Sequence, residues 1–508
     1  MTESASDINK QTSESQIETT KEYRSIFKAT SLFGGVKVYT ILIGIIRTKF
    51  VAVLLGTVGV GILGLYQSTI VFIGGLTALG LSTSAVRDVS EANASGDSLR
   101  IGRTVSVLRR LVWITGLFGL LTVAVLSPLL SRVTFGNNDY TIPFVFLSVI
   151  LLFDQISSGQ LVVLQGMRRL KSLAKATAIG STLGLIVSIP LYYWFGVKGI
   201  VPTLILNSAT SLLLSWFYAR KIPIKKVTIS TKDALADGRM MLKMGIAMTV
   251  SNTLVHGCSY VLRWFIRFTD GIDEVGIFVA GFSLMSTYVG MIFTAMTTDY
   301  YPRLAAVNHD NDRCKDTINR QAELALMIIA PLMVAIVTFI PIVVNILYSS
   351  SFISVGDYIA GASLGLVFRT MGWPIAYVFI AKSESRLYLV NELVANIYCL
   401  ILNILGYRFF GLLGLGISTS IGNGIYALQV YWLSHKRYDY KLSKDYLRLL
   451  ISQVILLLIV VLLFYFIHNY LVYAFGSVLI IMSALISFKE LNEKLDFRQM
   501  INQLRHGK

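Results

Sequence analysis

Apolar stretches of about twenty residues alternate with short polar segments along most of the chain. A helix needs about 20 apolar residues to cross the ~30 Å hydrocarbon core of a bilayer. The pattern therefore predicts an all-α polytopic membrane protein with about 14 transmembrane helices, which places both termini on one side. The predicted spans are 30–55, 62–84, 108–130, 142–167, 174–194, 198–219, 243–267, 275–301, 321–346, 356–381, 387–407, 411–434, 447–467 and 471–488.

Composition supports the membrane assignment. Of the 508 residues, 54% are hydrophobic and only 14% are charged, whereas soluble domains carry roughly 25% charged residues. Residues 1–29 contain no apolar run that could serve as the core of a signal peptide. We expect them to form a disordered cytoplasmic tail. The three cysteines form no CxxC pair, so the sequence indicates no disulfide framework or zinc site.

The distribution of Lys and Arg predicts the orientation. Of the 45 basic residues, 36 lie in the two tails and the even-numbered connections, including the span ends that border them. The odd-numbered connections hold three, and the remaining six lie within spans. Because cytoplasmic loops collect Lys and Arg, both termini are predicted to be cytoplasmic. The net charge of +17 thus needs no nucleic-acid partner.

The chain repeats itself at an offset of about 215 residues. The segment FGVKGIVPTLILNSATSLLLSWFYARK (195–221) aligns with FGLLGLGISTSIGNGIYALQVYWLSHK (410–436), and VGVGILG (58–64) aligns with VGIFVAG (275–281). Two parallel six-helix lobes are predicted around a central cavity, where such transporters bind their substrates. The predicted divisions are an N-terminal tail (1–29), an N-lobe (30–220), a cytoplasmic linker (221–242), a C-lobe (243–436), an extra helix pair (437–488) and a C-terminal tail (489–508).

Two short motifs have simple structural explanations. Gly59, Gly61 and Gly64 spell GxGxxG, but a dinucleotide site needs a preceding strand and a βαβ unit. We interpret these glycines as a tight turn with close helix packing. The segment NHDND (308–312) matches no known metal-site spacing and is interpreted as a solvated loop. Neither a metal nor a cofactor is expected.

Charges inside the spans are the more informative feature. A midplane Asp, Lys or Arg costs about 2.5–3.5 kcal/mol on insertion scales, so such residues usually face a bundle interior or a water-filled cavity. Asp154 and Arg369 correspond at offset 215 near the centres of their helices. They are candidates for an ion pair between the lobes, for a role in transport, or for both. Arg47 and Arg263 correspond at offset 216 in the outer thirds of their helices.

Several segments resemble the Wzx-type flippases of O-antigen and enterobacterial common antigen lipid intermediates, within the multidrug/oligosaccharidyl-lipid/polysaccharide exporter superfamily. These segments are FVAVLLGTVGVGILG (50–64), DEVGIF (273–278), YYPRL (300–304) and IAKSESRLYLVNE (380–392). The resemblance covers about residues 28–436. The family pattern places a basic residue where Arg263, Arg369, Lys382 and Arg386 stand.

The resemblance implies that the protein moves an undecaprenyl-diphosphate-linked oligosaccharide from the cytoplasmic to the periplasmic leaflet of the bacterial inner membrane. It implies a transporter that functions as a monomer, without enzymatic activity, with polysaccharide polymerase and chain-length proteins as candidate partners. Arg is a bidentate, permanently charged partner for phosphate oxygens. The candidate diphosphate-binding residues are Arg47, Arg263, Arg369, Lys49 and Lys37, with Lys382 and Arg386 at the cytoplasmic entrance.

Alternating access, in which the two lobes rock about the central cavity, is the expected mechanism. Asp154 is the candidate proton carrier, because it is the acid predicted to face that cavity. Two other functions remain open: a multidrug or cation antiporter of the same superfamily, and a flippase for the peptidoglycan lipid precursor. A membrane glycosyltransferase, polymerase or ligase is disfavoured, because the longest predicted outer loop, near 131–141, has only about a dozen residues.

The bias of 36 basic residues to three predicts where reporter fusions will be active. Fusions placed after His435 and at Lys508 should both report the cytoplasm, since the spans between them come as a pair. The measurement is the activity ratio of a cytoplasm-active reporter to a periplasm-active reporter at each site. A periplasmic signal at either site would contradict the predicted number of helices.

Overall fold

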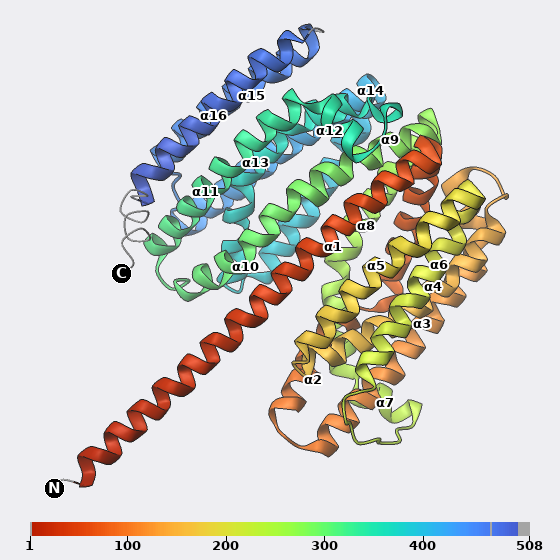
Figure 1. Ribbon diagram of the computed structural model, residues 1–508, viewed down its shortest axis with the longest axis vertical. Coiled ribbons are helices and arrows are strands. Elements are labelled where there is room, and N and C mark those ends of the chain that lie inside the picture. The colour runs from red at the N-terminus through yellow and green to blue at the C-terminus, as the bar shows by residue number, and fades with distance from the viewer. Residues whose placement is uncertain (1–2, 468–469, 496–508) are drawn as a thin grey trace. The chain divides into compact units, whose positions relative to one another are not determined.

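The fold was analysed in a computed structural model, which describes residues 3–467 and 470–495, with side chains from residue 35 onward except at 247, 248, 250–252, 494 and 495. Its described part is built from helices and contains no strand, as predicted (Figure 1). The elements are α1 (Glu3–Ala78), α2 (Leu81–Ala94), α3 (Ser98–Phe135), α4 (Thr141–Gly166), α5 (Leu170–Phe195), η1 (Gly196–Gly199), α6 (Ile200–Ala219), α7 (Thr231–Asp237), α8 (Arg239–Asp270), α9 (Ile272–Phe282), η2 (Ser283–Val289), α10 (Gly290–Ala306), α11 (Asn311–Thr338), α12 (Ile340–Leu347), η3 (Ser350–Phe352), α13 (Val355–Ala381), α14 (Ser385–Tyr438), α15 (Lys444–Phe466) and α16 (Leu471–Leu495).

Ten helical segments of the described chain are long and apolar enough to cross a membrane. Three of them, Gly35–Ala78, Leu170–Ala219 and Ser385–Tyr438, have 44, 50 and 54 residues, about twice the length of one span. Each is interrupted by a glycine with positive φ: Gly56 (64°), Gly196 (55°) and Gly411 (57°). Each can therefore supply two crossings. The helical class is confirmed, and the number 14 is compatible with these segments but stays a prediction.

The internal repeat is visible in the backbone. Residues with a left-handed backbone conformation occur in pairs. The two members of a pair lie 215 positions apart, one in each half of the chain. The pairs are Gly56 (φ 64°) with Gly271 (φ 96°), Arg168 (φ 53°) with Ser383 (φ 61°), and Gly196 (φ 55°) with Gly411 (φ 57°). Left-handed backbone is costly for residues other than glycine. Its recurrence at one offset shows that the turns of the two halves have the same geometry.

The turns at Arg168 and Ser383 also share their hydrogen bonds. The amide of Arg169 donates to the carbonyl of Leu164 at 2.8 Å, and the amide of Glu384 donates to the carbonyl of Phe379 at 2.8 Å. Both bonds close the end of a spanning helix in the manner of a Schellman cap, which satisfies carbonyls that the helix leaves open. The internal repeat predicted from sequence thus extends to the hydrogen bonds of individual helix caps.

The described chain forms two compact units, which we consider separately. Unit 1 comprises Met1–Phe50 with Ile70–Val250, and unit 2 comprises Val51–Thr69 with Ser251–Lys508. The boundary at residue 250 lies beyond the predicted linker, and residues 51–69 of the first half join the second unit. The predicted lobes are halves of the chain that correspond in sequence. Their boundaries differ from those of the compact units.

Unit 1 is organised around α3 and α4. Leu108, Leu111 and Val112 of α3 pack in one apolar cluster with Val163 of α4, and all four side chains are 3% exposed or less. The linker (221–242) lies along α3, where Gly102 is so close to the carbonyl oxygen of Lys225 that a Cβ atom would stand 2.4 Å from it. The linker, which is the most basic of the connections between spans, is thus held against the helix bundle.

Unit 2 is organised around α13, which is the most completely buried of its long helices and packs against α11, α14 and α15. The extra pair, α15 and α16, lies at the edge of the unit beside α11 (Figure 1). A buried contact joins the two helices: Ser483 Oγ donates to Gln453 Oε1 at 2.5 Å, and Gln453 Nε2 donates to Ser487 Oγ at 3.1 Å. Within an apolar helix pair, such polar contacts fix the relative register.

The glycines of the GxGxxG motif pack helix against helix, as predicted. Gly61 lies against α9, where an added Cβ would stand 2.1 Å from the carbonyl oxygen of Ile272. Reciprocally, a Cβ on Gly276 would stand 2.0 Å from the carbonyl oxygen of Thr57. This contact has local two-fold symmetry at offset 215, at which Gly61 and Thr57 correspond to Gly276 and Ile272. The structural register therefore differs by two residues from the alignment of VGVGILG with VGIFVAG. The turn itself lies at Gly56, before the motif.

The disorder of the N-terminal tail stays a prediction, although α1 begins at Glu3 and a helix can extend into the tail. The physical reason is that a helix, once begun, is easily lengthened. Once the first apolar span has formed, each further residue adds one helical hydrogen bond without a new nucleation cost. Glu, Lys and Gln, which are frequent in the tail, have favourable helix propensities.

Replacement of Gly61 by Ala should destabilise the protein, because the new Cβ would overlap a backbone carbonyl that belongs to another helix. We expect a loss of about 1–3 kcal/mol, the usual cost of overpacking. Gly44→Ala is the matched control, since a Cβ there meets no atom within 4 Å. The measurement is the apparent Tm of the detergent-solubilised protein. Equal Tm values for the two variants would contradict the close contact.

Candidate functional site

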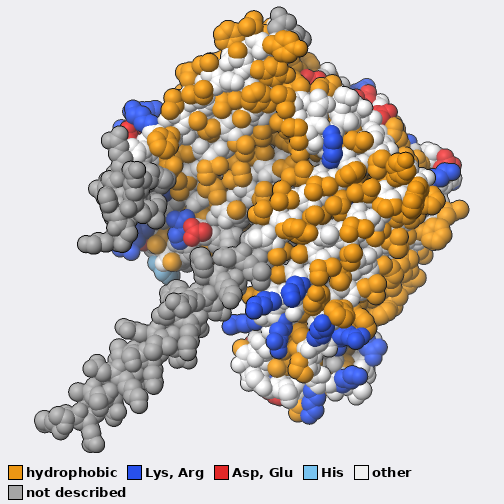
Figure 2. Space-filling model, in the orientation of Figure 1, with side chains coloured by type: hydrophobic (Ala, Val, Ile, Leu, Met, Phe, Trp, Pro, Cys, Tyr) orange, Lys and Arg blue, Asp and Glu red, His pale blue; other side chains and the backbone are white. Residues whose placement is uncertain are grey.

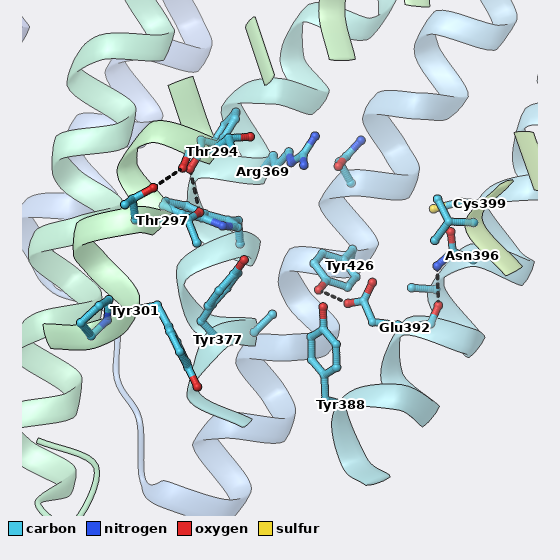
Figure 3. Close-up of a pocket in the computed structure, with 18 residues that line it drawn as sticks. Thr294, Thr297, Tyr301, Arg369, Tyr377, Tyr388, Glu392, Asn396, Cys399 and Tyr426 are labelled. Carbon is cyan, nitrogen blue, oxygen red and sulfur yellow. Dashed lines mark hydrogen bonds between the residues drawn. The ribbon is translucent and has the colours of Figure 1, made fainter. Parts of the chain in front are cut away.

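A cavity of about 730 Å³ lies within unit 2 (Figure 3). Its walls come from α10, α13 and α14, with one residue of α8. On each of the three main helices the lining residues recur at intervals of three and four, so each helix presents one face to the cavity. The lining residues are Val255, Phe293, Thr294, Thr297, Thr298, Tyr301, Pro302, Arg369, Trp373, Ala376, Tyr377, Tyr388, Glu392, Ala395, Asn396, Cys399, Asn423 and Tyr426.

Arg369 is the basic residue of this cavity. Its guanidinium carbon lies 5.0 Å from the ring centroid of Phe293, a cation–π geometry. The side chain is partly buried and interacts electrostatically with Glu392 and Tyr426. No carboxylate in the described part of unit 2 lies within the 4.0 Å ion-pair limit of this guanidinium. Its hydrogen-bonding edge therefore remains available to an anion inside the cavity.

Glu392 is the acid of the cavity, and the sequence analysis did not identify it. Its carboxylate accepts a hydrogen bond from the hydroxyl of Tyr426 at 2.5 Å, and Figure 3 shows Tyr388 beside the same carboxylate. Asp154 stays the acid predicted for the central cavity, and Glu392 is a further acid, found in the cavity of unit 2. Glu392 ends the motif IAKSESRLYLVNE and lies two turns inside α14, a depth that could have marked it.

Aromatic rings and hydroxyl groups make up most of the remaining wall. The rings of Tyr377 and Trp373 stand 5.9 Å apart at 69°, and those of Tyr301 and Tyr377 stand 6.0 Å apart at 66°. Thr297 donates to the carbonyl of Phe293 at 2.7 Å, which leaves the lone pairs of its hydroxyl oxygen free to accept. Rings with polar tips next to hydroxyl and amide groups can contact both the apolar faces and the hydroxyls of a sugar.

Arg263 lies on α8 in unit 2 and does not line this cavity. Its guanidinium carbon is 5.6 Å from the ring centroid of Phe282, and its Nε atom is buried without a hydrogen-bond partner. An unpaired buried guanidinium nitrogen is costly. Arg263 is therefore a second cationic group of unit 2 with unused hydrogen-bonding capacity.

The other predicted basic residues have varied surroundings. On α1, Arg47 is partly buried beside Tyr192 of α5, Lys49 has an interaction partner, and Lys37 is exposed. These three belong to unit 1, whereas Arg263 and Arg369 belong to unit 2. Their participation in one diphosphate site stays a prediction.

The predicted entrance residues lie at the turn between α13 and α14. The ammonium of Lys382 donates to the carbonyl of Asn308 at 2.6 Å and to Asn311 Oδ1 at 2.8 Å. It therefore ties this turn to the start of α11. Arg386 is exposed. Of the two residues, Arg386 therefore has the more solvent-accessible charge.

Asp154 accepts a hydrogen bond from Ser208 of α6, and its side chain is exposed on unit 1. The equivalents of these two residues at offset 215 are Arg369 and Asn423, which both line the cavity of unit 2. The repeat therefore places a charged residue and a small polar residue at the same pair of positions in each half. Pairing of Asp154 with Arg369 stays a prediction.

Comparison with known proteins supports the resemblance inferred from sequence. The chain is 21% identical over 356 residues to a lipid III flippase of Escherichia coli (strain K12), which covers 69% of this chain and 83% of that protein. The corresponding protein of Shigella flexneri matches equally. A family model described as lipid II flippase MurJ matches residues 281–484.

Solved structures show the same fold. An inward-facing multidrug resistance MATE family transporter of the MOP superfamily has a TM-score of 0.68 at 16% identity, covering 79% of this chain and 94% of that one. The lipid II flippase MurJ in an inward closed conformation has a TM-score of 0.62 at 15% identity, covering 86% and 97%. The model of a further family, described as polysaccharide biosynthesis protein, matches residues 50–357, well over half of the chain. On this evidence the chain belongs to the polysaccharide biosynthesis protein family.

Proposed function

We propose that the protein is a flippase that moves an undecaprenyl-diphosphate-linked oligosaccharide from the cytoplasmic to the periplasmic leaflet of the inner membrane. The observation that carries this proposal is the cavity of unit 2, in which Arg369 stands among aromatic, hydroxyl and amide side chains. The similarity to a lipid III flippase supports it. The role is that of a transporter without enzymatic activity.

Arg369 would hold the diphosphate. Guanidinium groups bind phosphate oxygens bidentately, and charged side chains within the membrane mostly serve substrate or ion pathways. The stacking of its guanidinium on Phe293 leaves the N–H edge for an anion. Arg263, with its unpaired Nε, lies outside this cavity, and its predicted contact with the diphosphate remains part of the proposal. The predicted contributions of Arg47, Lys49 and Lys37 belong to the same proposal.

The sugar units would contact Trp373, Tyr377 and Tyr301, whose edges and faces line the same cavity. Binding pockets for small ligands typically have volumes of about 300–1,000 Å³, a range that includes this cavity. The lipid tail would remain in the bilayer, because transfer of its apolar surface into a polar cavity is unfavourable. The substrate would thus be bound by its head and carried through alternating access.

Two carboxylates are candidates for coupling transport to an ion gradient. Asp154 was predicted from its depth in an apolar span, and Glu392 shares the cavity with Arg369. A phosphate that binds Arg369 would reduce the favourable interaction of the guanidinium with Glu392 and would add a negative charge nearby. Both effects favour proton uptake by Glu392. We propose Glu392 as the primary coupling residue and Asp154 as the second.

A flippase for the peptidoglycan precursor is the second candidate function, because the lipid II flippase model matches residues 281–484. Both substrates present a diphosphate, so Arg369 serves either. Complementation separates the two: viability of a strain depleted of its lipid II flippase tests one function, and surface glycan in a strain deficient in its glycan flippase tests the other. The proposed orientation has both termini cytoplasmic.

Arg369→Ala should abolish most glycan export. Loss of a hydrogen-bonded charge costs about 1.5–3 kcal/mol, or roughly tenfold to more than a hundredfold in rate. Arg369→Lys should keep part of the export, because it retains the charge without the bidentate geometry. The measurement is surface glycan per inserted protein, with the exposed Arg408→Ala as the matched control. Normal export by Arg369→Ala would contradict the proposed site.

Glu392→Gln should uncouple export from the proton gradient while the protein still inserts, because the amide cannot take up a proton. The measurement is transport into vesicles at several external pH values, with Asp154→Asn in parallel and Tyr426→Phe as a control that keeps the carboxyl group. We expect a flattened pH profile for Glu392→Gln. For Tyr426→Phe we expect a profile that keeps its slope but moves to higher pH, because the carboxylate loses a hydrogen-bond donor. An unchanged profile for Glu392→Gln with a flattened one for Asp154→Asn would transfer the coupling role to Asp154.

A further inference from the structure

A second pocket lies in unit 1, far along the chain from the residues proposed to bind substrate. It has a volume of about 540 Å³ and is formed between α3 and the linker that precedes α7. Two arginines, three hydroxyl side chains and a tryptophan line it together with aliphatic residues. The lining residues are Ser106, Arg109, Arg110, Trp113, Ile114, Leu117, Val227, Thr228, Ile229 and Thr231.

The linker wall of this pocket is held in place by specific contacts. Arg110 donates to the carbonyl of Ile229 at 3.2 Å, and two turns nearer the start of α3 Arg103 forms a 2.7 Å ion pair with Asp237 at the end of α7. Ser230 caps α7 by accepting from the amide of Asp233 at 3.1 Å. The pocket is therefore a built feature of the linker and not an open gap beside a free loop.

Arg109 enters the pocket without a partner for its charge. Its Nε atom is buried and makes no hydrogen bond. Nearby arginines of the same region are paired, Arg100 with Glu91 at 2.6 Å and Arg103 with Asp237. No carboxylate in the described part of unit 1 lies within 4.0 Å of Arg109 or Arg110. A guanidinium left unpaired in a pocket with three hydroxyls is a binding geometry for an oxyanion.

An apolar stripe leads from this pocket along α3. Trp113, Leu117, Leu121 and Val125 follow at intervals of four residues, and their side chains are 43–75% exposed. Apolar side chains cover much of the helices, and basic side chains gather at the end of unit 1 where α7 and the linker lie (Figure 2). Tryptophan is enriched at membrane interfaces, where lipid headgroups lie. The pocket thus combines a tryptophan with basic side chains, the residue types found at headgroup depth, and an exposed apolar stripe continues from it along α3.

From this juxtaposition we propose that the pocket binds the phosphate of an anionic membrane phospholipid, with Arg109 and Arg110 on the phosphate and an acyl chain along the stripe that begins at Trp113. The stripe favours a phospholipid over free phosphate, because a soluble anion makes no use of exposed apolar surface. The pocket shares no lining residue with the proposed transport cavity. A bound lipid would fasten the linker to α3.

The test uses the full chain in nanodiscs that contain a minor fraction of phosphatidylglycerol with brominated acyl chains, or brominated phosphatidylcholine instead. Bromine quenches tryptophan at short range, and the difference from Trp113→Phe isolates the signal of Trp113. We expect phosphatidylglycerol to quench Trp113 more strongly than phosphatidylcholine. Arg109→Gln with Arg110→Gln should weaken the apparent affinity for phosphatidylglycerol about tenfold or more, since each basic residue near an anionic surface contributes substantially.

The matched control is Lys171→Gln with Lys175→Gln, which removes the same charge from exposed positions on α5 and should keep the preference for phosphatidylglycerol. If the arginine double variant does not insert, Arg109→Lys serves in its place, with a smaller loss expected. Equal quenching by the two lipids in the wild-type protein, or equal loss in the lysine control, would overturn the proposal. Reversal of the quenching by millimolar inorganic phosphate or pyrophosphate would also overturn it, since it would assign the pocket to a soluble anion or to the substrate's diphosphate.

Discussion

A bilayer offers the backbone no hydrogen-bond partners, and the described structure follows from this constraint. Within hydrocarbon only a continuous helix satisfies every amide and carbonyl, so the chain can change direction only where a helix ends. The ends coincide with residues in the left-handed region, above all Gly56, Gly196, Gly271 and Gly411. The positions of these few turns set the length of each helix and therefore the depth of every side chain on it.

Depth explains why Arg369 and Glu392 belong together. Each is a charged side chain well inside an apolar helix, where isolated charges are strongly disfavoured. Rather than forming a close ion pair, the guanidinium stacks on Phe293 and the carboxylate accepts from Tyr426. Both charges are thereby stabilised separately, and both keep hydrogen-bonding capacity toward the cavity. A close ion pair would have satisfied the two charges at the expense of that capacity.

The sequence predicts the features that depend on the periodicity of apolar residues. It does not predict the features that depend on which helix faces pack against each other. Helical class, spans and the repeat follow from local patterns, and the offset of 215 residues is reproduced by turns such as Arg168 and Ser383. Arg369 could be found because an arginine within an apolar run is conspicuous. Glu392 was not paired with it, although α13 and α14 are joined by a short turn, because the apolar pattern of each helix does not show which of its faces meets the other. The association of residues 51–69 with unit 2 has the same origin.

The reciprocal contact of Gly61 and Gly276 has a consequence for how substitutions act on the two halves of the chain. Residue i of one segment touches residue j of the other, and their equivalents touch in return, which defines an isologous interface. Two separate half-length chains could form the same contact as a homodimer. In such a dimer, one substitution at the glycine would alter both symmetric halves of the interface. In a fused chain, each of the two glycines can change alone. The present chain has a glycine at both positions, so the contact is self-complementary within a single chain.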